Sequence, residues 1–218
     1  MRSIIAIGHN TFKEAIRDRI LYGFLFFAIA LILFSLVLGQ LSLGQKLRAT
    51  IDIGLMGISF VSVLISIFLG ITLLNKEIEK RTIYPVLAKP VSRGAYVIGK
   101  FFGLVSVVFV QIAMMVAIFF PLIIFQGGSI TTGLVSALIL IFAETVLIVS
   151  MALFFTSFSS PFLSGIFCLG LFVAGRNANL ILELARNEKM EWAAPLLKGV
   201  VAVLPNLYLF YPSGKLVE

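Results

Sequence analysis

Few side chains in this sequence could take part in chemistry, and Glu144 stands out among them. It is an acidic residue in the middle of an apolar run, Leu134 to Phe155. A carboxyl group at that depth in lipid is costly, and it indicates a functional site by default. Glu144 could bind a cationic substrate, relay a proton or hydrogen-bond to a neighbouring helix. Because no basic residue is available in the other apolar runs, we expect it to be protonated or to face a polar cavity, with Gln111 as a hydrogen-bonding partner.

Other reactive groups are scarce. The sequence has no Walker A glycine loop, no HExxH pair and no hydrolase elbow. Cys168 is the only cysteine and His9 the only histidine, which excludes a thiolate or His-rich metal site built by this chain alone. Cys168 is most simply a packing residue, and His9 a polar surface residue. We therefore predict no catalytic activity, no metal and no cofactor for this chain.

The composition indicates that lipid surrounds most of the chain. Of the 218 residues, 60% are hydrophobic and 12% charged, with a mean hydropathy of +1.11. Soluble domains carry about 25% charged residues, so a water-soluble fold could not hide this much apolar surface. The formal charge of +7 would suit nucleic acid, but basic residues in a membrane protein first report its orientation. We therefore expect the lipid bilayer as a partner and no nucleic acid.

The apolar runs are continuous rather than alternating, which predicts membrane-spanning helices and excludes a barrel. A hydrocarbon core of about 30 Å needs roughly 20 apolar residues in a helix. The predicted fold class is therefore an all-α integral membrane protein, a polytopic helical bundle. Its five predicted spans are Ile20 to Leu38, Ile53 to Leu74, Phe101 to Phe125, Leu134 to Phe155 and, more weakly, Phe158 to Gly175.

The basic residues predict the orientation. They crowd the segment before the first span and the 75–100 connection between the second and third spans. Basic segments face the cytoplasm, so the N-terminus and the 75–100 connection are expected inside. The turns are short: the Gly127 turn is expected outside, and the 156–161 turn, which joins spans four and five as a packed hairpin, inside. The fifth span would then leave Arg176 and the 176–218 segment outside.

Two segments outside the lipid carry helical signals. Residues 1–19 are predicted to form an amphipathic helix along the interface, the alternative being an extension of the first span. In the 75–100 connection, Ser92 is a plausible N-cap for the next helix, and Pro85 and Pro90 bracket about one helical turn. Such a charged segment between two membrane helices suits the transmission of force, although an ordinary topology-setting loop explains it equally well.

A longer pattern distinguishes these two interpretations. The run Glu77-x-Glu79-x-x-Thr82, followed by Leu87-Ala-Lys-Pro-Val-Ser-Arg93 and closed by Gly99-Lys100, resembles the signature between spans two and three of ABC-2 type permeases. The N-terminal His9-Asn-Thr-Phe12 and the later Leu204-Pro-Asn-Leu207 are similar too. The resemblance covers essentially the whole chain, 1–218. It is strongest to the bacterial branch of copper-enzyme-maturation and gliding-motility permeases.

The resemblance implies how the chain works. Two permease copies, here a homodimer, would pair with ATP-binding cassette ATPase subunits in the bacterial cytoplasmic (inner) membrane and act as an exporter. ATP and Mg would bind in the ATPase. The 75–100 connection would dock on the ATPase, and the substrate would pass between permeases along spans one, two and five. The residues expected at the docking contact are Glu77, Glu79, Arg81, Thr82, Lys89 and Arg93.

The resemblance leaves three points open. Family members usually have six spans, and no clear sixth run is evident; Ala193 to Tyr211 is expected to form an external surface or re-entrant helix. The cargo is not indicated. An ion-coupled secondary transporter using Glu144 is an alternative, but it predicts inverted repeats that we do not detect. A membrane-embedded enzyme or assembly factor is a further alternative, but an enzyme would need more polar groups at one depth than Glu144.

Overall fold

A computed structural model describes residues 2–41, 46–79, 92–185, 199 and 207 of the chain. Within these residues the regular structure is helical throughout, as predicted. The helices are α1 (Arg2–Ile16), α2 (Arg19–Leu41), α3 (Lys46–Glu79), α5 (Arg93–Phe125), α6 (Thr132–Thr156), α7 (Pro161–Arg176) and α8 (Ala178–Ala185).

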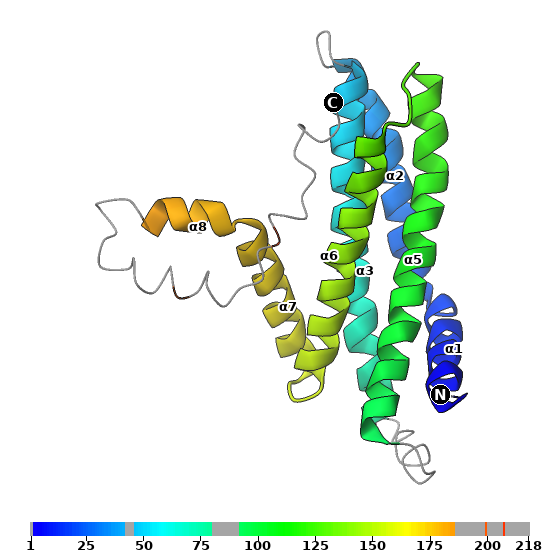
Figure 1. The fold of residues 1–218 in the computed structure, drawn as a ribbon, viewed down its shortest axis with the longest axis vertical. Helices are drawn as coiled ribbons and strands as arrows, with labels where there is room; N and C mark the ends of the chain where they lie inside the picture. Colours follow the sequence, from blue (N-terminus) through cyan, green and yellow to red (C-terminus); the bar gives the residue numbers. More distant parts are fainter. Residues whose placement is uncertain (1, 42–45, 80–91, 186–198, 200–206, 208–218) are drawn as a thin grey trace.

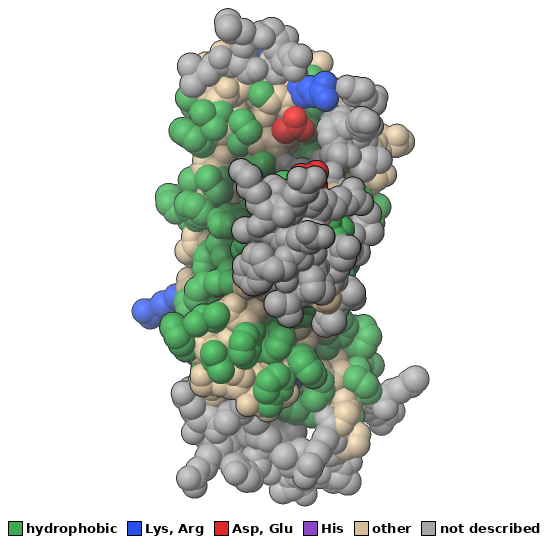
Figure 2. Space-filling view, turned by 90° about the vertical axis from the view of Figure 1, so that its left-hand side faces the viewer, with side chains coloured by type: hydrophobic (Ala, Val, Ile, Leu, Met, Phe, Trp, Pro, Cys, Tyr) green, Lys and Arg blue, Asp and Glu red, His purple; other side chains and the backbone are tan. Residues whose placement is uncertain are grey.

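Four of the five predicted spans are helices long and apolar enough to cross a membrane, namely α2, α3, α5 and α6. The fifth run forms α7, which has only 16 residues. At 1.5 Å per residue α7 is about 24 Å long, which is less than the hydrocarbon thickness of about 30 Å. Hydrophobic side chains make up most of the described surface on the flank that carries α7 and α8 (Figure 2). The chain is therefore a polytopic helical membrane protein.

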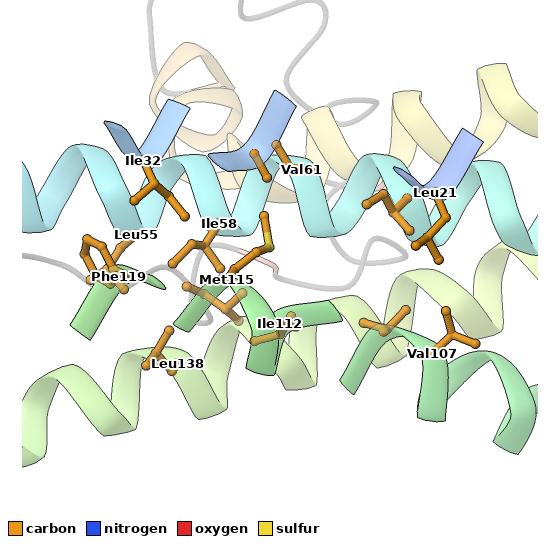
Figure 3. Packing of buried hydrophobic residues seen from close by; sticks show 14 of the residues in the cluster. Leu21, Ile32, Leu55, Ile58, Val61, Val107, Ile112, Met115, Phe119 and Leu138 are labelled. Carbon is orange, nitrogen blue, oxygen red and sulfur yellow. The ribbon is translucent and has the colours of Figure 1, made fainter. Parts of the chain in front are cut away.

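Helix α3 is the centre of the bundle. It packs against α1, α2, α5, α6 and α7, and 67% of its apolar stretch is buried, compared with 22% to 39% for the other three long helices. Glycines permit this close packing. A Cβ at Gly54 would lie 2.2 Å from the Phe119 ring of α5, and one at Gly70 would lie 2.7 Å from the Ala152 Cβ of α6. Figure 3 shows side chains of α3 and α5 meeting in this core, among them Ile58, Val61 and Met115.

The connections gather at two opposite ends of the bundle, as the predicted orientation requires. The start of α1, the end of α3, the start of α5 and the α6–α7 turn lie toward one end, while the end of α2, the start of α3 and the α5–α6 turn lie toward the other (Figure 1). At the second end the hydroxyl of Thr50 donates to the side-chain oxygen of Gln126 at 3.3 Å. Which of the two ends faces the cytoplasm stays a prediction.

Local signals in the sequence place the helix ends. The Ser92 hydroxyl accepts a hydrogen bond from the backbone N–H of Ala95, so Ser92 is the predicted N-cap of α5. Gly127, just after α5, has a φ of 79°, which favours glycine. Pro161 stands in the first turn of α7, where its missing N–H is not needed. Pro121 inside α5 has no such position, and it removes one helical hydrogen bond there.

Helix α1 is a separate helix rather than an extension of α2, since the chain turns between Ile16 and Arg19. It packs along α5 through small residues. A Cβ at Gly103 would lie 2.7 Å from the carbonyl oxygen of Gly8, and a Cβ at Gly99 would lie 2.8 Å from the Cβ of Ile7. The Gly99-x-x-x-Gly103 pair is therefore a packing site for α1, a role typical of this spacing in membrane helices.

We predict that Gly103→Ala weakens the packing of α1 on α5. The added methyl group would lie 2.7 Å from both the carbonyl oxygen of Gly8 and the Cβ of Thr11, so α1 itself must shift, and such overpacking costs about 1–3 kcal/mol. Thermal unfolding of the purified protein in detergent should show a lower midpoint. Gly94→Ala in the same helix is the control, because a Cβ there meets nothing within 4 Å. Equal midpoints for Gly103→Ala and the wild type would contradict this account.

Candidate functional site

The first cluster of charged side chains lies at the end of the bundle that carries the 80–91 connection. We call it the basal cluster, and its members are Glu14, Asp18, Lys76, Glu77, Tyr96 and Lys100. Lys100 is at its centre, with a side chain only 2% exposed. Its Nζ lies 2.6 Å from Oε1 of Glu77 and 3.9 Å from Oε2 of Glu14. Lys100 thus links α5 to both α3 and α1.

Two further contacts complete the basal cluster. The Tyr96 hydroxyl of α5 donates to Glu77 of α3. The Lys76 ammonium lies 2.6 Å from a carboxylate oxygen of Asp18, whose other oxygen accepts from the backbone N–H of Ile20 at 3.1 Å. Burial by itself would raise the pKa of Asp18, but the hydrogen bonds from Lys76 and Ile20 and the charge of Lys76 outweigh it and lower the pKa below its ordinary value of 3.8.

The basal cluster holds together the end of α3 and the start of α5, the two helices on either side of residues 80–91. Glu77 stands two residues before the end of α3, and Lys100 lies in the second turn of α5. Glu77 is therefore engaged within the chain, which is a structural role in addition to the docking role predicted for it. Glu79 ends α3 and Arg93 begins α5, so their backbones flank the connection. The remaining predicted docking residues, Arg81, Thr82 and Lys89, lie outside the described residues.

The second cluster lies halfway along the membrane helices. We call it the midspan cluster, and its members are Ser59 of α3, Glu144 of α6 and Arg176 of α7. The Arg176 Nη1 lies 3.1 Å from Oε1 and 3.5 Å from Oε2 of Glu144. The Ser59 hydroxyl donates to Oε2 of Glu144 at 3.0 Å and accepts from Arg176 Nη1 at 3.0 Å. Three helices therefore meet at one ion pair.

The prediction that Glu144 lacks a basic neighbour is wrong. Arg176 was expected beyond the outer end of a complete fifth span, but α7 is short and ends at mid-height of the bundle, where α8 turns aside (Figure 1). The predicted external segment therefore begins within the height of the bundle. Leu207, further along the chain, is fully buried in a cluster with Val63 and Cys168. The segment 193–211 otherwise lies almost wholly outside the described residues.

Gln111 does not join Glu144. Its side-chain nitrogen donates to the Met115 sulfur at 3.5 Å, one turn along the same helix, and its side-chain oxygen has no hydrogen-bond partner among the described residues. Gln111 is buried on α5. Both residues sit in spans, as predicted, but the partners of Glu144 come from α3 and α7. Cys168 is buried among apolar side chains and His9 is exposed, in keeping with the packing and surface roles predicted for them.

An apolar groove adjoins the midspan cluster. It runs between α2, α3 and α7 and has a volume of about 450 Å³. Among the described residues, its walls are apolar or small side chains except for Arg176, the one charged residue of this part of the chain that lines it. The Arg176 guanidinium lies 5.5 Å from the ring centroid of Phe172. The principal apolar residues lining the groove are Phe27, Leu31, Phe34, Met56, Phe60 and Phe172.

We predict that the two lysines of the basal cluster differ in their effect on stability. Lys100→Met leaves the carboxylate of Glu77 without its buried counter-charge, which costs about 3 kcal/mol. Lys76 is 42% exposed, so Lys76→Met should cost less than about 1 kcal/mol. Denaturant titration in detergent micelles measures both free energies of unfolding. A loss for Lys76→Met equal to or larger than that for Lys100→Met would contradict the assignment of Lys100 as the centre of the cluster.

We predict that the stabilisation from Asp18 depends on pH. Because the folded state holds its pKa below 3.8, the ionised carboxylate stabilises the fold above that value. The stabilisation disappears as the pH falls through the folded pKa. The free energy of unfolding of Asp18→Asn should therefore lie below that of the wild type at neutral pH and converge with it below pH 3.8. When both proteins also carry Lys76→Met, the difference between their free energies of unfolding at neutral pH should be smaller. A difference between Asp18→Asn and the wild type that does not change with pH would refute the stabilising role of the Asp18 carboxylate.

Comparison with known families places this geometry in context. A family model described as ABC-2 family transporter protein matches residues 5–174. The match covers α1 to α6 and almost all of α7, and therefore Glu77, Lys100 and Glu144, and it ends just before Arg176. No curated protein matches the chain. The narrower resemblance to copper-enzyme-maturation and gliding-motility permeases stays a prediction. Because the match spans most of the sequence and every long membrane helix, the chain belongs to the ABC-2 transporter family and is a membrane permease of the ABC-2 type.

Proposed function

We propose that this chain is the membrane-spanning subunit of an ATP-binding cassette exporter driven by a separate ATPase subunit. Permeases of this family generally work with an ATPase partner. The observation that carries the proposal is the pairing of Lys100 with Glu77, which fastens the two helices on either side of the 80–91 connection. An ATPase that moves this connection would move the ends of α3 and α5 together.

The path from the connection to the groove runs along α3. This helix is continuous over 34 residues, so it is about 51 Å long. It carries Glu77 in the basal cluster and Ser59 in the midspan cluster, which are separated by about 27 Å along the helix. A stiff helix held at both positions would transmit a displacement from the base to the groove. ATP and Mg belong to the ATPase in this proposal, and this chain supplies no catalytic group.

The substrate path in this proposal follows the groove. Its walls come from α2, α3 and α7, which correspond to the first, second and fifth predicted spans. A second permease copy would face this side and enclose the path between the two subunits. The subunit would reside in the bacterial cytoplasmic membrane with its N-terminus and the 80–91 connection in the cytoplasm. An ion-coupled transporter that uses Glu144 to bind a cation is disfavoured, because Arg176 already neutralises that carboxylate.

We predict that reversing the charges that flank the connection abolishes ATPase binding. Glu79→Lys combined with Arg93→Glu inverts the charge at the last residue of α3 and the first residue of α5. Co-purification of the ATPase with the tagged permease should fall at least tenfold, a loss of about 1.4 kcal/mol or more. The matched control is Lys46→Glu at the opposite end of α3, which should retain the ATPase. Full retention by the double variant would refute the docking assignment.

A further inference from the structure

We propose that the groove between α2, α3 and α7 binds an amphiphile with one apolar chain and an anionic head group, and that the head group contacts Arg176 in place of Glu144. The inference rests on the proposed function, because it names the class of substrate that the same groove would carry. Four observations support it: the lining of the groove, the position of Arg176, the burial of Glu144 and the place of Ser59 between them.

The lining selects an apolar chain. Phenylalanine rings from all three helices face the groove, among them Phe27, Phe60 and Phe172. A hydrophilic solute would leave its hydroxyl groups without hydrogen bonds against these rings, which is costly. The volume of about 450 Å³ is in the range of sites for small organic ligands. A hydrocarbon chain loses no hydrogen bonds when it enters such a groove.

The position of Arg176 selects the head group. Of the described residues that line the groove it is the one that carries a charge, and its side chain is 20% exposed. Arg176 forms an ion pair with Glu144, but only the guanidinium reaches the groove, so an anionic head group can accept charge-assisted hydrogen bonds there and a cationic head group cannot. A neutral head group would gain little from the guanidinium. The groove therefore combines an apolar wall with a cation at one place, which matches an anionic amphiphile.

The arrangement of the midspan cluster allows Arg176 to exchange Glu144 for the head group of a ligand. Glu144 is 1% exposed and lies behind Arg176, so a ligand in the groove meets the cation first. A guanidinium binds carboxylates and other anionic oxygens through the same donors. The Ser59 hydroxyl lies 3.0 Å from both Arg176 and Glu144, and it can keep its hydrogen bond to Glu144 when the ligand contacts Arg176. Glu144 thus acts as an internal competitor for the ligand.

This competition predicts opposite effects of two substitutions in the same ion pair. The purified subunit in phosphatidylcholine nanodiscs is titrated with radiolabelled palmitate, and in parallel with hexadecanol and hexadecyltrimethylammonium. Glu144→Gln keeps the shape of the side chain but removes the competing charge, so the palmitate affinity should rise roughly three- to tenfold, the scale of polar interactions between membrane helices. Arg176→Gln should reduce palmitate binding at least tenfold. Neither substitution should alter the affinity for hexadecanol. Of the three ligands, hexadecyltrimethylammonium should have the lowest affinity for the wild type.

A groove-filling variant provides a test that leaves the ion pair intact. Met56 lines the groove from α3 and is 51% exposed, so Met56→Trp should occupy the chain site and lower palmitate affinity. The control is Ile139→Trp, at a position on α6 that is 62% exposed and is not among the residues lining the groove. Equal palmitate affinities for Met56→Trp and Ile139→Trp would overturn the proposed location.

The remaining outcomes are equally decisive. An unchanged or weaker palmitate affinity in Glu144→Gln, or a rise shared by hexadecanol, would overturn the exchange at Arg176. Full palmitate binding by Arg176→Gln would overturn the role of the guanidinium. ATPase co-purification is measured on the same preparations. Loss of the ligand effects with the ATPase retained would refute this inference alone, whereas retention of the ATPase by the charge-reversed docking variant would refute only the docking assignment of the proposed function.

Discussion

A charge enclosed in an apolar bundle must find its counter-charge within that bundle, and this requirement organises the protein. Lys100 and Glu144 are 2% and 1% exposed, and each is paired with a residue from another helix. Separating either pair would leave an uncompensated charge in a medium of low dielectric. The pairs therefore determine which helices move together: α3 with α5 at the base, and α6 with α7 at mid-span. A rearrangement that separates either pair has to supply a new counter-charge or change the protonation of the group that is left behind.

Helix α3 connects the basal cluster and the midspan cluster, because it contributes a residue to each. Ser59 contacts the midspan ion pair, and Glu77 contacts the basal lysine, so both clusters hold the same stiff rod. Gly54 and Gly70 let α5 and α6 approach this rod more closely than any larger residue would allow. Close-packed interiors transmit displacement rather than absorb it. In the proposed coupling between the connection and the groove, Gly54 and Gly70 are thus as important as the charged residues.

Much of the fold was predictable because it depends on local properties. The length of an apolar run predicts a span. Ser92 acts through its side-chain hydroxyl, and Gly127 and Pro161 act through their own backbone geometry. The midspan ion pair was not predictable in this way. The run from Phe158 to Gly175 is long enough to suggest a span, but Pro161 delays the start of the helix and leaves it 16 residues. The depth of Arg176 follows from that start and from the path of α7. The sequence signal for this ion pair was the presence of one carboxylate, Glu144, within an apolar run and of one guanidinium, Arg176, directly after the shortest run. Gln111 was at a reasonable depth, but its side chain bonds to Met115 one turn along α5 rather than to Glu144, and the face that α5 turns toward α6 is set by packing rather than by sequence spacing.

The two clusters bury charges of opposite sign, a lysine at the base and a glutamate at mid-span, although helix α3 links them. At the base the cation Lys100 is enclosed, and the carboxylate of Glu14 beside it is 35% exposed. At mid-span the acid is enclosed and the cation reaches the groove. A molecule that approaches the base from outside meets both the carboxylate of Glu14 and the ammonium of Lys76, which is 42% exposed, whereas a molecule in the groove meets the guanidinium of Arg176. The base therefore presents charges of both signs, whereas the groove presents a cation beside apolar walls, so in the proposed function the groove rather than the base would discriminate among ligands by their charge.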